Sequence, residues 1–167
     1  MVLLSIYQIP IVLLDHWGEE VIGYEYFVLN VFLRNAGILG TINRKVHFAS
    51  GRNIEMGDES GIGANTSIPG NTVIGSHVIL SRNCFILDKN HIFERTDVPL
   101  NDQGCYPPKK TIIEDDCWIG MNTLITPGRH ISKGTIVGMG SVVTKDYPPY
   151  SIIGGAPAKL IRNRLAK

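Results

Sequence analysis

The sequence predicts an all-β protein whose main part is a parallel β-helix, and the spacing of its apolar residues carries this prediction. Aliphatic residues return at every sixth position in two blocks of the 167-residue chain. The anchors are Met56, Ile62, Ile68, Ile74, Leu80 and Ile86 in the first block and Ile113, Ile119, Ile125, Ile131, Val137 and Val143 in the second. Such spacing fits neither an amphipathic helix nor a half-buried strand, which repeat at about 3.6 and about 2 residues. It is typical of coils in which a short strand alternates with a tight turn.

The residues around each anchor support the same coil. Glycine follows five of the anchors, at positions 57, 63, 75, 120 and 138, and permits a tight turn there. A small or β-branched residue stands four positions after most anchors, as Thr66 and Thr123 do, whereas Arg129 is an exception. Strand alternation points the anchor and the residue two places before it toward the interior. Three hexads close one triangular coil, so we expect about four coils stacked about 4.8 Å apart.

We expect the two ends of the chain to cap this stack, whose terminal coils would otherwise be open. Residues 1–45 are predicted to form an apolar segment and a capping helix, residues 46–153 the β-helix, and residues 154–167 a short C-terminal helix. The first helix is predicted over residues 19–35, with acidic side chains in its first turn. The second is predicted over residues 156–167, after a Gly-Gly turn.

The long segment between the two blocks, residues 92–112, is polar, contains prolines and is out of phase with the hexads. We predict that it is a loop ejected from one corner of the prism, and such inserts in compact domains are usually functional. His91 fills the last outward position before this loop. Because imidazole changes its charge near neutral pH, His91 is a candidate general base. His77 and His130 lie inside regular hexads, where we expect solvated side chains.

Composition excludes several classes of protein. The chain has 16 Lys+Arg against 15 Asp+Glu, a net charge of +1, so it lacks the counterion-release drive of a nucleic-acid binder. Its three cysteines form no C-x-x-C pair, which favours neither a disulfide framework nor a zinc site. The apolar residues 1–14 are shorter than the about 20 residues of a membrane span and lack the basic start of a secretory signal. We therefore expect a cytoplasmic protein, and for the N-terminal segment we favour capping over contact with a membrane surface.

Several segments together resemble the hexapeptide-repeat acyltransferases. They are the hexads, the histidine-bearing loop, residues 113–120 (IEDDCWIG) and the tail over residues 138–162. The nearest likeness is to the galactoside and maltose O-acetyltransferases and to relatives that acetylate surface polysaccharides. This resemblance covers residues 48–162. It implies a left-handed β-helix, a homotrimer with active sites between neighbouring subunits, acetyl-CoA as acyl donor without a metal, and a carbohydrate acceptor.

The resemblance also implies roles for individual residues. His91 would take the proton from a sugar hydroxyl while that oxygen attacks the thioester directly. Trp118 would lie along the pantetheine arm, and a backbone N–H near Gly120 and Met121 would bind the oxyanion. The further acetyl-CoA contacts are Met139, Gly140, Thr144, Lys145 and Arg162. Of these, Lys145 and Arg162 carry the positive charge that phosphates attract.

The acceptor side is expected near Asp88, Asn90 and Glu94, and the sequence does not decide which carboxylate orients His91. Galactoside and maltose enzymes hold their sugar with an aromatic-x-Asn stretch, and the matching place here is residues 61–63 (GIG). The chain shares residues 90–93 (NHIF) and 102–104 (DQG) with the polysaccharide-acetylating relatives. A capsule or lipopolysaccharide sugar, or its precursor, is therefore the favoured acceptor.

Three other functions and one other reaction route are compatible with parts of the sequence. A xenobiotic (antibiotic) O-acetyltransferase shares the fold and the base and differs in the loop. A non-catalytic β-helix scaffold would not need His91, Trp118 and Lys145 together, yet all three are present. A γ-type carbonic anhydrase needs three zinc-bound histidines, and the required close pair is missing from the sequence. A covalent route through Cys84 is disfavoured because Cys84 occupies an inward position.

Overall fold

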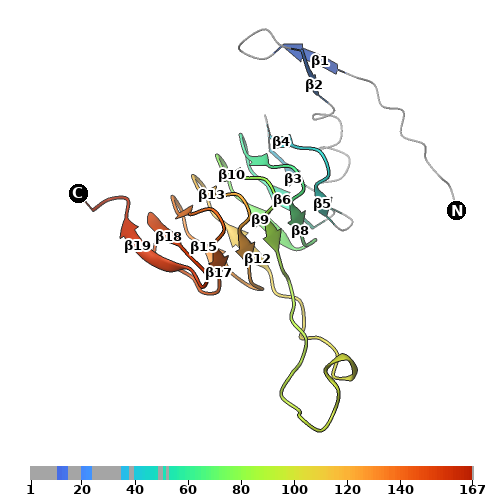
Figure 1. Ribbon diagram of the computed structural model, residues 1–167. Helices are drawn as coiled ribbons and strands as arrows, with labels where there is room; N and C mark the ends of the chain where they lie inside the picture. Colours follow the sequence, from blue (N-terminus) through green and yellow to red (C-terminus); the bar gives the residue numbers. More distant parts are fainter. Residues whose placement is uncertain are drawn as a thin grey trace, which may run out of the picture.

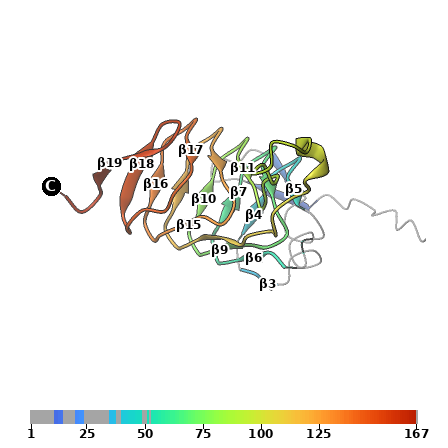
Figure 2. The ribbon, with the colours of Figure 1, turned by 90° about the horizontal axis from the view of Figure 1, so that it is seen from below.

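The computed structural model describes residues 11–14, 20–23, 35–37, 40–48, 51 and 53–166. Most of these residues form a prism of stacked coils, with three short strands to each coil (Figures 1 and 2). Strands on the same side of successive coils pair in parallel and keep one register, as Ile79 does with Trp118 and Leu80 with Ile119. The predicted parallel β-helix is confirmed, and the stacking is consistent with the left-handed form.

The strands fall on three sides of the prism. Side 1 holds β3 (Asn35–Ala36), β6 (Glu55–Met56), β9 (Thr72–Ile74), β12 (Thr111–Ile113) and β15 (His130–Ile131). Side 2 holds β4 (Thr41–Ile42), β7 (Gly61–Ile62), β10 (Ile79–Leu80), β13 (Trp118–Ile119), β16 (Ile136–Val137), β18 (Ser151–Gly154) and β19 (Lys159–Asn163). Side 3 holds β5 (His47–Phe48), β8 (Ser67–Ile68), β11 (Phe85–Ile86), β14 (Leu124–Ile125) and β17 (Val142–Val143).

The interior of the prism is filled by the predicted anchors. Each of the twelve is at most 3% exposed. The residue two positions before an anchor is buried as well, except Arg129. The buried hydroxyls of Thr111 and Thr135 have no hydrogen-bond partner among the described residues. Elsewhere the hydroxyl bonds to a carbonyl: Thr123 Oγ1 donates to the Gly120 oxygen at 2.6 Å, and Ser141 Oγ to the Gly138 oxygen at 2.6 Å. These bonds satisfy polar atoms that would otherwise be costly to bury.

The corner between sides 2 and 3 shows why particular residues stand at the turns. Asn65, Asn83 and Asn122 have φ angles of 57–59°, in the left-handed region that Asn tolerates better than most residues. Their side chains also bond to one another from coil to coil, at 3.2 and 3.1 Å. Gly140 continues this column with a φ of 68°. The turn geometry is therefore a sufficient structural reason for that glycine.

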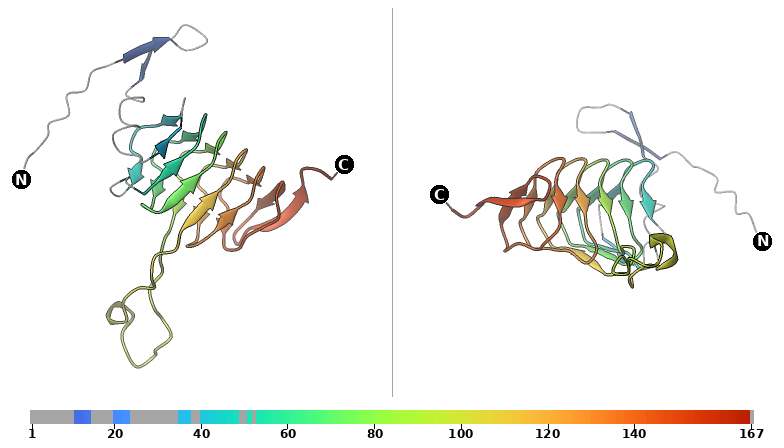
Figure 3. Two further views of the ribbon diagram at one scale, coloured as in Figure 1. Left: turned by 180° about the vertical axis from the view of Figure 1, so that it is seen from behind. Right: turned by 60° about the horizontal axis from the view of Figure 1, so that its bottom comes forward.

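The ends of the prism differ from the sequence prediction. β3, β4 and β5 form a coil ahead of the predicted four, so the β-helix begins before residue 46. At the other end the predicted C-terminal helix is wrong: β19 pairs antiparallel with β18 in a hairpin (Figure 3). The open edge of β18 offers backbone groups to a returning strand, and this outweighs the helical propensity of the tail.

The N-terminal helix prediction fails at its start. Residues 20–23 form β2 (Glu20–Gly23), which pairs antiparallel with β1 (Ile11–Leu14). Residues 24–34, the rest of the predicted helix, lie outside the described residues. Within the described part of the chain, no helix has the length and apolar character to cross a bilayer.

Candidate active site at the extended loop

The loop leaves the prism between β11 on side 3 and β12 on side 1, at residues 87–110, and projects far from it (Figures 1 and 3). It therefore begins and ends slightly earlier than the predicted residues 92–112. Its two arms run antiparallel and bond to each other: the Lys109 N–H donates to the Asp88 oxygen at 2.7 Å, and the Tyr106 N–H to the Asn90 oxygen at 2.9 Å. The loop thus has a paired stem.

Gln103 holds the outer part of the loop together. Its amide nitrogen donates to the carbonyl oxygens of Arg95 and Val98, each at 2.8 Å, and its amide oxygen accepts from the Arg95 N–H at 3.2 Å. A short 3₁₀ turn, η1 (Leu100–Asp102), precedes it. Gly104 follows with a φ of 80°, which favours glycine. The Asp-Gln-Gly stretch noted in the sequence therefore shapes the loop.

His91 stands on the stem, where it forms an isolated antiparallel bridge with Cys105. The imidazole is exposed, and its Nδ1 lies 3.6 Å from the Cys105 sulfur. The sequence did not point to Cys105, because it stands fourteen positions after His91 and no local pattern indicates their contact. The register of the loop stem brings the two side chains together.

The acidic candidates near His91 are arranged differently from the expectation. The Glu94 carboxylate accepts hydrogen bonds from the Tyr106 hydroxyl and from the Phe93 N–H, the latter at 3.2 Å. Phe93 and Tyr106 also meet edge to face, with ring centroids 6.3 Å apart. Glu94 is thus engaged with an aromatic pair of the loop. Asn90 and Asp88 are stem residues whose carbonyls accept the bonds that close it.

A second group of predicted residues lies on side 2 and the adjoining corner. Trp118, on β13, points outward and is 48% exposed, in register between Ile79 and Ile136 of the neighbouring coils. Met121 and Met139 are 40% and 73% exposed. They belong to stacked turns, because the Gly140 N–H donates to the Met121 oxygen at 2.8 Å. The structure therefore gathers Trp118, Met121, Met139 and Gly140 into one exposed strip.

Gly120 has a structural reason for its presence in this strip. A Cβ there would lie 2.6 Å from the Met139 nitrogen, so only glycine lets the two coils approach. Its N–H donates to the Val137 oxygen at 2.8 Å. Of the two predicted oxyanion donors, the Met121 N–H is therefore the better candidate.

The remaining predicted contacts lie elsewhere on the prism. Thr144 and Lys145 follow β17 at the corner from which the loop departs two coils earlier. Lys145 is exposed, with its Nζ 5.3 Å from the centroid of the Tyr147 ring. Arg162 is exposed on β19, opposite Ile152. In one chain, the residues predicted to bind acetyl-CoA thus occupy side 2, the corner between sides 2 and 3, and the corner between sides 3 and 1 from which the His91 loop departs.

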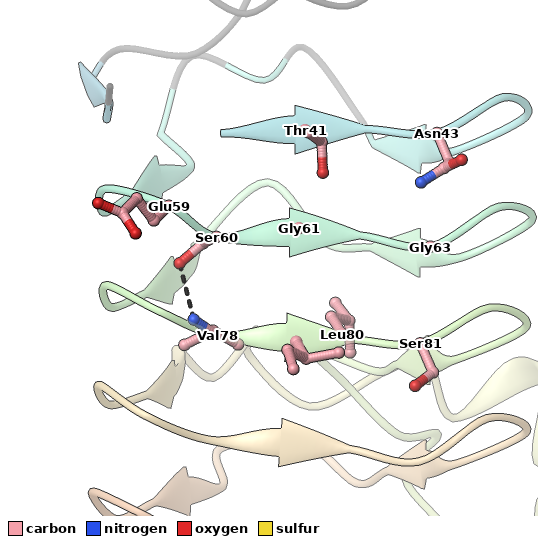
Figure 4. Close-up of a pocket in the computed structure, with 10 residues that line it drawn as sticks. Thr41, Asn43, Glu59, Ser60, Gly61, Gly63, Val78, Leu80 and Ser81 are labelled. Atoms are coloured by element: carbon pink, nitrogen blue, oxygen red, sulfur yellow. Dashed lines mark hydrogen bonds between the residues drawn. The ribbon is translucent and has the colours of Figure 1, made fainter. Parts of the chain in front are cut away.

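An open hollow of about 600 Å³ lies on side 2, over the first three coils (Figure 4). It exists because Gly61 lacks a side chain where the coils above and below present Thr41 and Ile79. Ile79 is 60% exposed and supplies an apolar wall, while Asn43, Glu59 and Ser81 supply polar atoms. Gly61 and Gly63, where the resemblance would place an aromatic-x-Asn stretch, both line it.

The other two cysteines are packing residues. Cys84 and Cys117 are at most 1% exposed, and burial raises the pKa of both thiols, that of Cys117 to about 11. A thiol held protonated in this way is a poor nucleophile. No cluster of three or more His, Cys, Asp or Glu side chains that could hold a metal occurs among the described residues.

Comparisons with known proteins agree with this architecture. The family model described as the hexapeptide repeat of succinyl-transferase matches residues 110–145. A hexapeptide-repeat-containing acetyltransferase from Vibrio cholerae superposes with a TM-score of 0.74 at 27% identity, over 81% of this chain and 77% of that one. The same protein complexed with acetyl-CoA gives a TM-score of 0.71. A maltose O-acetyltransferase from Clostridium difficile 630 gives 0.62 at 28% identity, over 81% and 72% of the two chains.

Curated relatives match over shorter stretches. A chloramphenicol acetyltransferase from Agrobacterium fabrum is 46% identical over 61 residues, 36% of this chain and 29% of that protein. A probable acetyltransferase from Mycobacterium tuberculosis is 36% identical over 91 residues, 54% of this chain and 30% of that protein. The chain thus spans less than a third of the length of these two relatives.

The fold and the loop together define a parallel β-helix protein with a histidine presented on a paired stem outside the prism. Its repeats, the family model matched at residues 110–145 and its structural neighbours then show what the particular group of similar proteins is: the chain carries hexapeptide repeats and is similar in fold to hexapeptide-repeat acetyltransferases.

Proposed function

We propose that this protein is an acetyl-CoA-dependent O-acetyltransferase whose acceptor is a sugar hydroxyl of a cell-surface polysaccharide or of its precursor. The observation that carries the proposal is His91, exposed on the stem of a structured loop, on a β-helix similar to that of an acetyltransferase solved with acetyl-CoA. The enzyme would act in the cytoplasm, where acetyl-CoA is available.

The proposed reaction is a direct transfer. His91 accepts the proton of the acceptor hydroxyl as that oxygen attacks the thioester carbonyl, and the Met121 N–H is the proposed donor to the oxyanion. The tetrahedral intermediate then collapses, the carbon–sulfur bond breaks, and the CoA thiolate leaves and takes up the proton from His91. The burial of Cys84 and Cys117 supports a route without a covalent enzyme intermediate on either of them.

The exposed strip on side 2 supports the proposed binding of acetyl-CoA. Trp118, Met121 and Met139 offer apolar surface to the pantetheine arm, and nothing lies within 4 Å of the place where a Gly140 Cβ would stand. The arm could therefore approach the backbone at Gly140 closely. Lys145 and Arg162 are the proposed partners of the phosphates, with Thr144 beside Lys145.

The separation of these groups supports a homotrimer with shared active sites. His91 extends from the corner of sides 1 and 3, whereas Trp118 lies on side 2, so a complete site needs the loop of one copy beside side 2 of another. Ile79, Phe85 and Trp118 are 60%, 49% and 48% exposed, which is apolar surface that a second prism would cover.

The hollow at Gly61 supports an acceptor larger than a free mono- or disaccharide. The hollow joins an apolar wall at Ile79 to polar atoms of Asn43 and Ser81, a mixture that suits a sugar ring. Because Gly61 leaves room where an aromatic residue would stand, a chain of linked sugars has space to bind.

The first experiment tests whether the protein binds acetyl-CoA, and the second tests whether His91 is the general base. Acetyl-CoA binding is measured by calorimetry, and absence of binding at millimolar concentration would overturn the class. CoA release is then followed with a panel of glycans, and His91→Ala is expected to lose at least about 100-fold in rate. His77→Asn is the matched control, because His77 has a φ of 58° that Asn tolerates. Equal rates for His91→Ala and wild type would show that His91 is not the base.

The second candidate is a xenobiotic O-acetyltransferase, favoured by the identity shared with the chloramphenicol acetyltransferase of Agrobacterium fabrum. The same assay separates the two, because chloramphenicol is added to the acceptor panel. A rate on chloramphenicol that exceeds the rate on every glycan by about tenfold or more would favour the second candidate. Acetyl-CoA binding without transfer to any acceptor would favour a non-catalytic scaffold.

A further inference from the structure

We propose that Cys105 positions the imidazole of His91, holding Nδ1 so that Nε2 is the nitrogen presented to the acceptor hydroxyl. This inference rests on the proposed function, in which His91 is the base. It names a group that orients the ring, whereas the Glu94 carboxylate near His91 in the sequence is engaged with Tyr106.

The backbone register forces the two side chains together. His91 and Cys105 are directly opposite in an antiparallel bridge. The hydrogen bonds flank the pair, with the Ile92 N–H donating to the Gly104 oxygen at 3.1 Å and the Tyr106 N–H to the Asn90 oxygen at 2.9 Å. This is the non-hydrogen-bonded type of pair, in which opposite Cα atoms lie only about 4.5 Å apart and both side chains stand on one face.

The contact between the side chains involves one ring nitrogen, Nδ1. The Cys105 sulfur lies 3.6 Å from Nδ1 of His91. For Nε2 to accept a proton, the neutral ring must carry its hydrogen on Nδ1, and that hydrogen needs an acceptor. In this tautomer Nδ1–H donates to the sulfur of Cys105. The thiol therefore takes the place that a carboxylate or a carbonyl takes beside other catalytic histidines.

The loop holds Cys105 firmly enough for this task. On one side of it, Gly104 sets the turn with its φ of 80°, next to the Gln103 side chain that bonds three backbone groups. On the other side, the Tyr106 hydroxyl donates to Glu94. Packing explains the two other cysteines, but Cys105 is exposed and has no such explanation.

The first measurement does not depend on activity. Long-range ¹H–¹⁵N NMR of histidine-labelled protein reports which ring nitrogen of His91 carries the hydrogen, and a His91→Gln sample assigns the signal. We expect the Nδ1–H tautomer in wild type, a shift toward the Nε2–H tautomer in Cys105→Ala, and a return in Cys105→Ser, whose oxygen accepts from Nδ1–H. An unchanged tautomer in Cys105→Ala would overturn the inference.

The second measurement uses the best acceptor from the panel. Cys105→Ala is expected to lower kcat by about 10- to 100-fold while KM for acetyl-CoA stays within about twofold, and Cys105→Ser is expected to recover most of kcat. Thr96→Ala, on the exposed outer part of the same loop, is the matched control. Rates of Cys105→Ala within twofold of wild type would overturn the inference.

The two proposals fail in different ways. Failure of acetyl-CoA binding, or an active His91→Ala variant, would count against the proposed function, and the tautomer measurement would still decide whether Cys105 holds the ring. An inactive His91→Ala beside a fully active Cys105→Ala would count against Cys105 alone. Backbone amide shifts of the loop in Cys105→Ser show that the stem is intact, so a loss confined to Cys105→Ala is a loss of the thiol's contact.

Discussion

Gly63→Ala tests the close stacking of the coils, on which the whole prism depends. Gly63 directly follows β7 and lies against the turn of the next coil. A Cβ at this position would be 2.4 Å from the Arg82 nitrogen, 2.4 Å from the Ser81 carbonyl carbon and 2.8 Å from the Arg82 Cα. All three are backbone atoms, which cannot rotate away.

The destabilisation follows from the size of this overlap. Ordinary Cβ contacts begin at 3.4 Å, so the coils must separate by about 1 Å (3.4 − 2.4). The bond between the Gly63 N–H and the Leu80 oxygen, 2.6 Å long, would stretch to about 3.6 Å and be lost. The lost bond costs about 0.5–1.5 kcal/mol and the overpacking about 1–3 kcal/mol, together about 2–4 kcal/mol. The thermal midpoint of a domain of this size should fall by about 5–15 °C.

Gly61→Ala, two residues earlier and on β7 itself, is the matched control. Its Cβ would meet the Thr41 Oγ1 atom at 3.0 Å, the end of a side chain that can turn aside. We expect its free energy of unfolding to stay within about 1 kcal/mol of wild type. Thermal unfolding is followed by circular dichroism at one protein concentration for all three proteins. A midpoint of Gly63→Ala that falls no further than that of Gly61→Ala would show that the close approach of the coils at Gly63 does not limit stability.

Two further predictions concern titratable side chains. A thiol reagent at pH 7–8 should modify only the exposed Cys105 in the native protein, because Cys84 and Cys117 are buried. After unfolding it should modify all three cysteines. Rapid modification of two or three thiols in the native protein would contradict the described burial. The Lys133 N–H and then the His130 ring lower the pKa of Glu114, so its contribution to stability is present above its ordinary pKa and is lost as the pH falls through the lowered value. When the pH is lowered from about 6 to about 3.5, the thermal midpoint should therefore fall by about 1–3 °C less in Glu114→Gln than in wild type. An equal fall of the midpoint in the two proteins would show that Glu114 does not contribute to the pH dependence of stability.

The sequence alone was sufficient for the central part of the fold. Each coil repeats one local requirement, an apolar residue inward and a small residue two positions before it, so the period of six is written in the chain itself. Ile119 and Thr123 are buried as that pattern requires. The approximate position of the loop could also be predicted from the sequence, because its residues break the six-residue repeat. The first coil was missed because its side 1 strand offers only Ala36 as an anchor and because eight positions, not six, separate Phe48 from Met56.

The candidate site was predicted only in part. The sequence singles out His91 because it stands where the repeat ends, and the resemblance implies that Trp118, Met121 and Met139 contact acetyl-CoA. The structure leaves all four side chains exposed, and their roles stay predictions. The hollow at Gly61 is lined by residues from three coils, so no local sequence pattern predicts it. The division of the candidate site between the loop and side 2 likewise follows from the winding of the chain.

The tertiary structure decided the features in which distant backbone segments meet. Residues 156–167 have the composition of a basic helix, yet the unpaired edge of β18 binds β19 as a strand, because pairing with a preformed edge satisfies backbone groups that local propensity cannot. The contact between His91 and Cys105 arises in the same way, from the register of two paired arms. The sequence determined which residues repeat and where the repeat stops, because those are local patterns. Strand register determined which side chains touch across the loop and along the prism edge, because it depends on the whole stack.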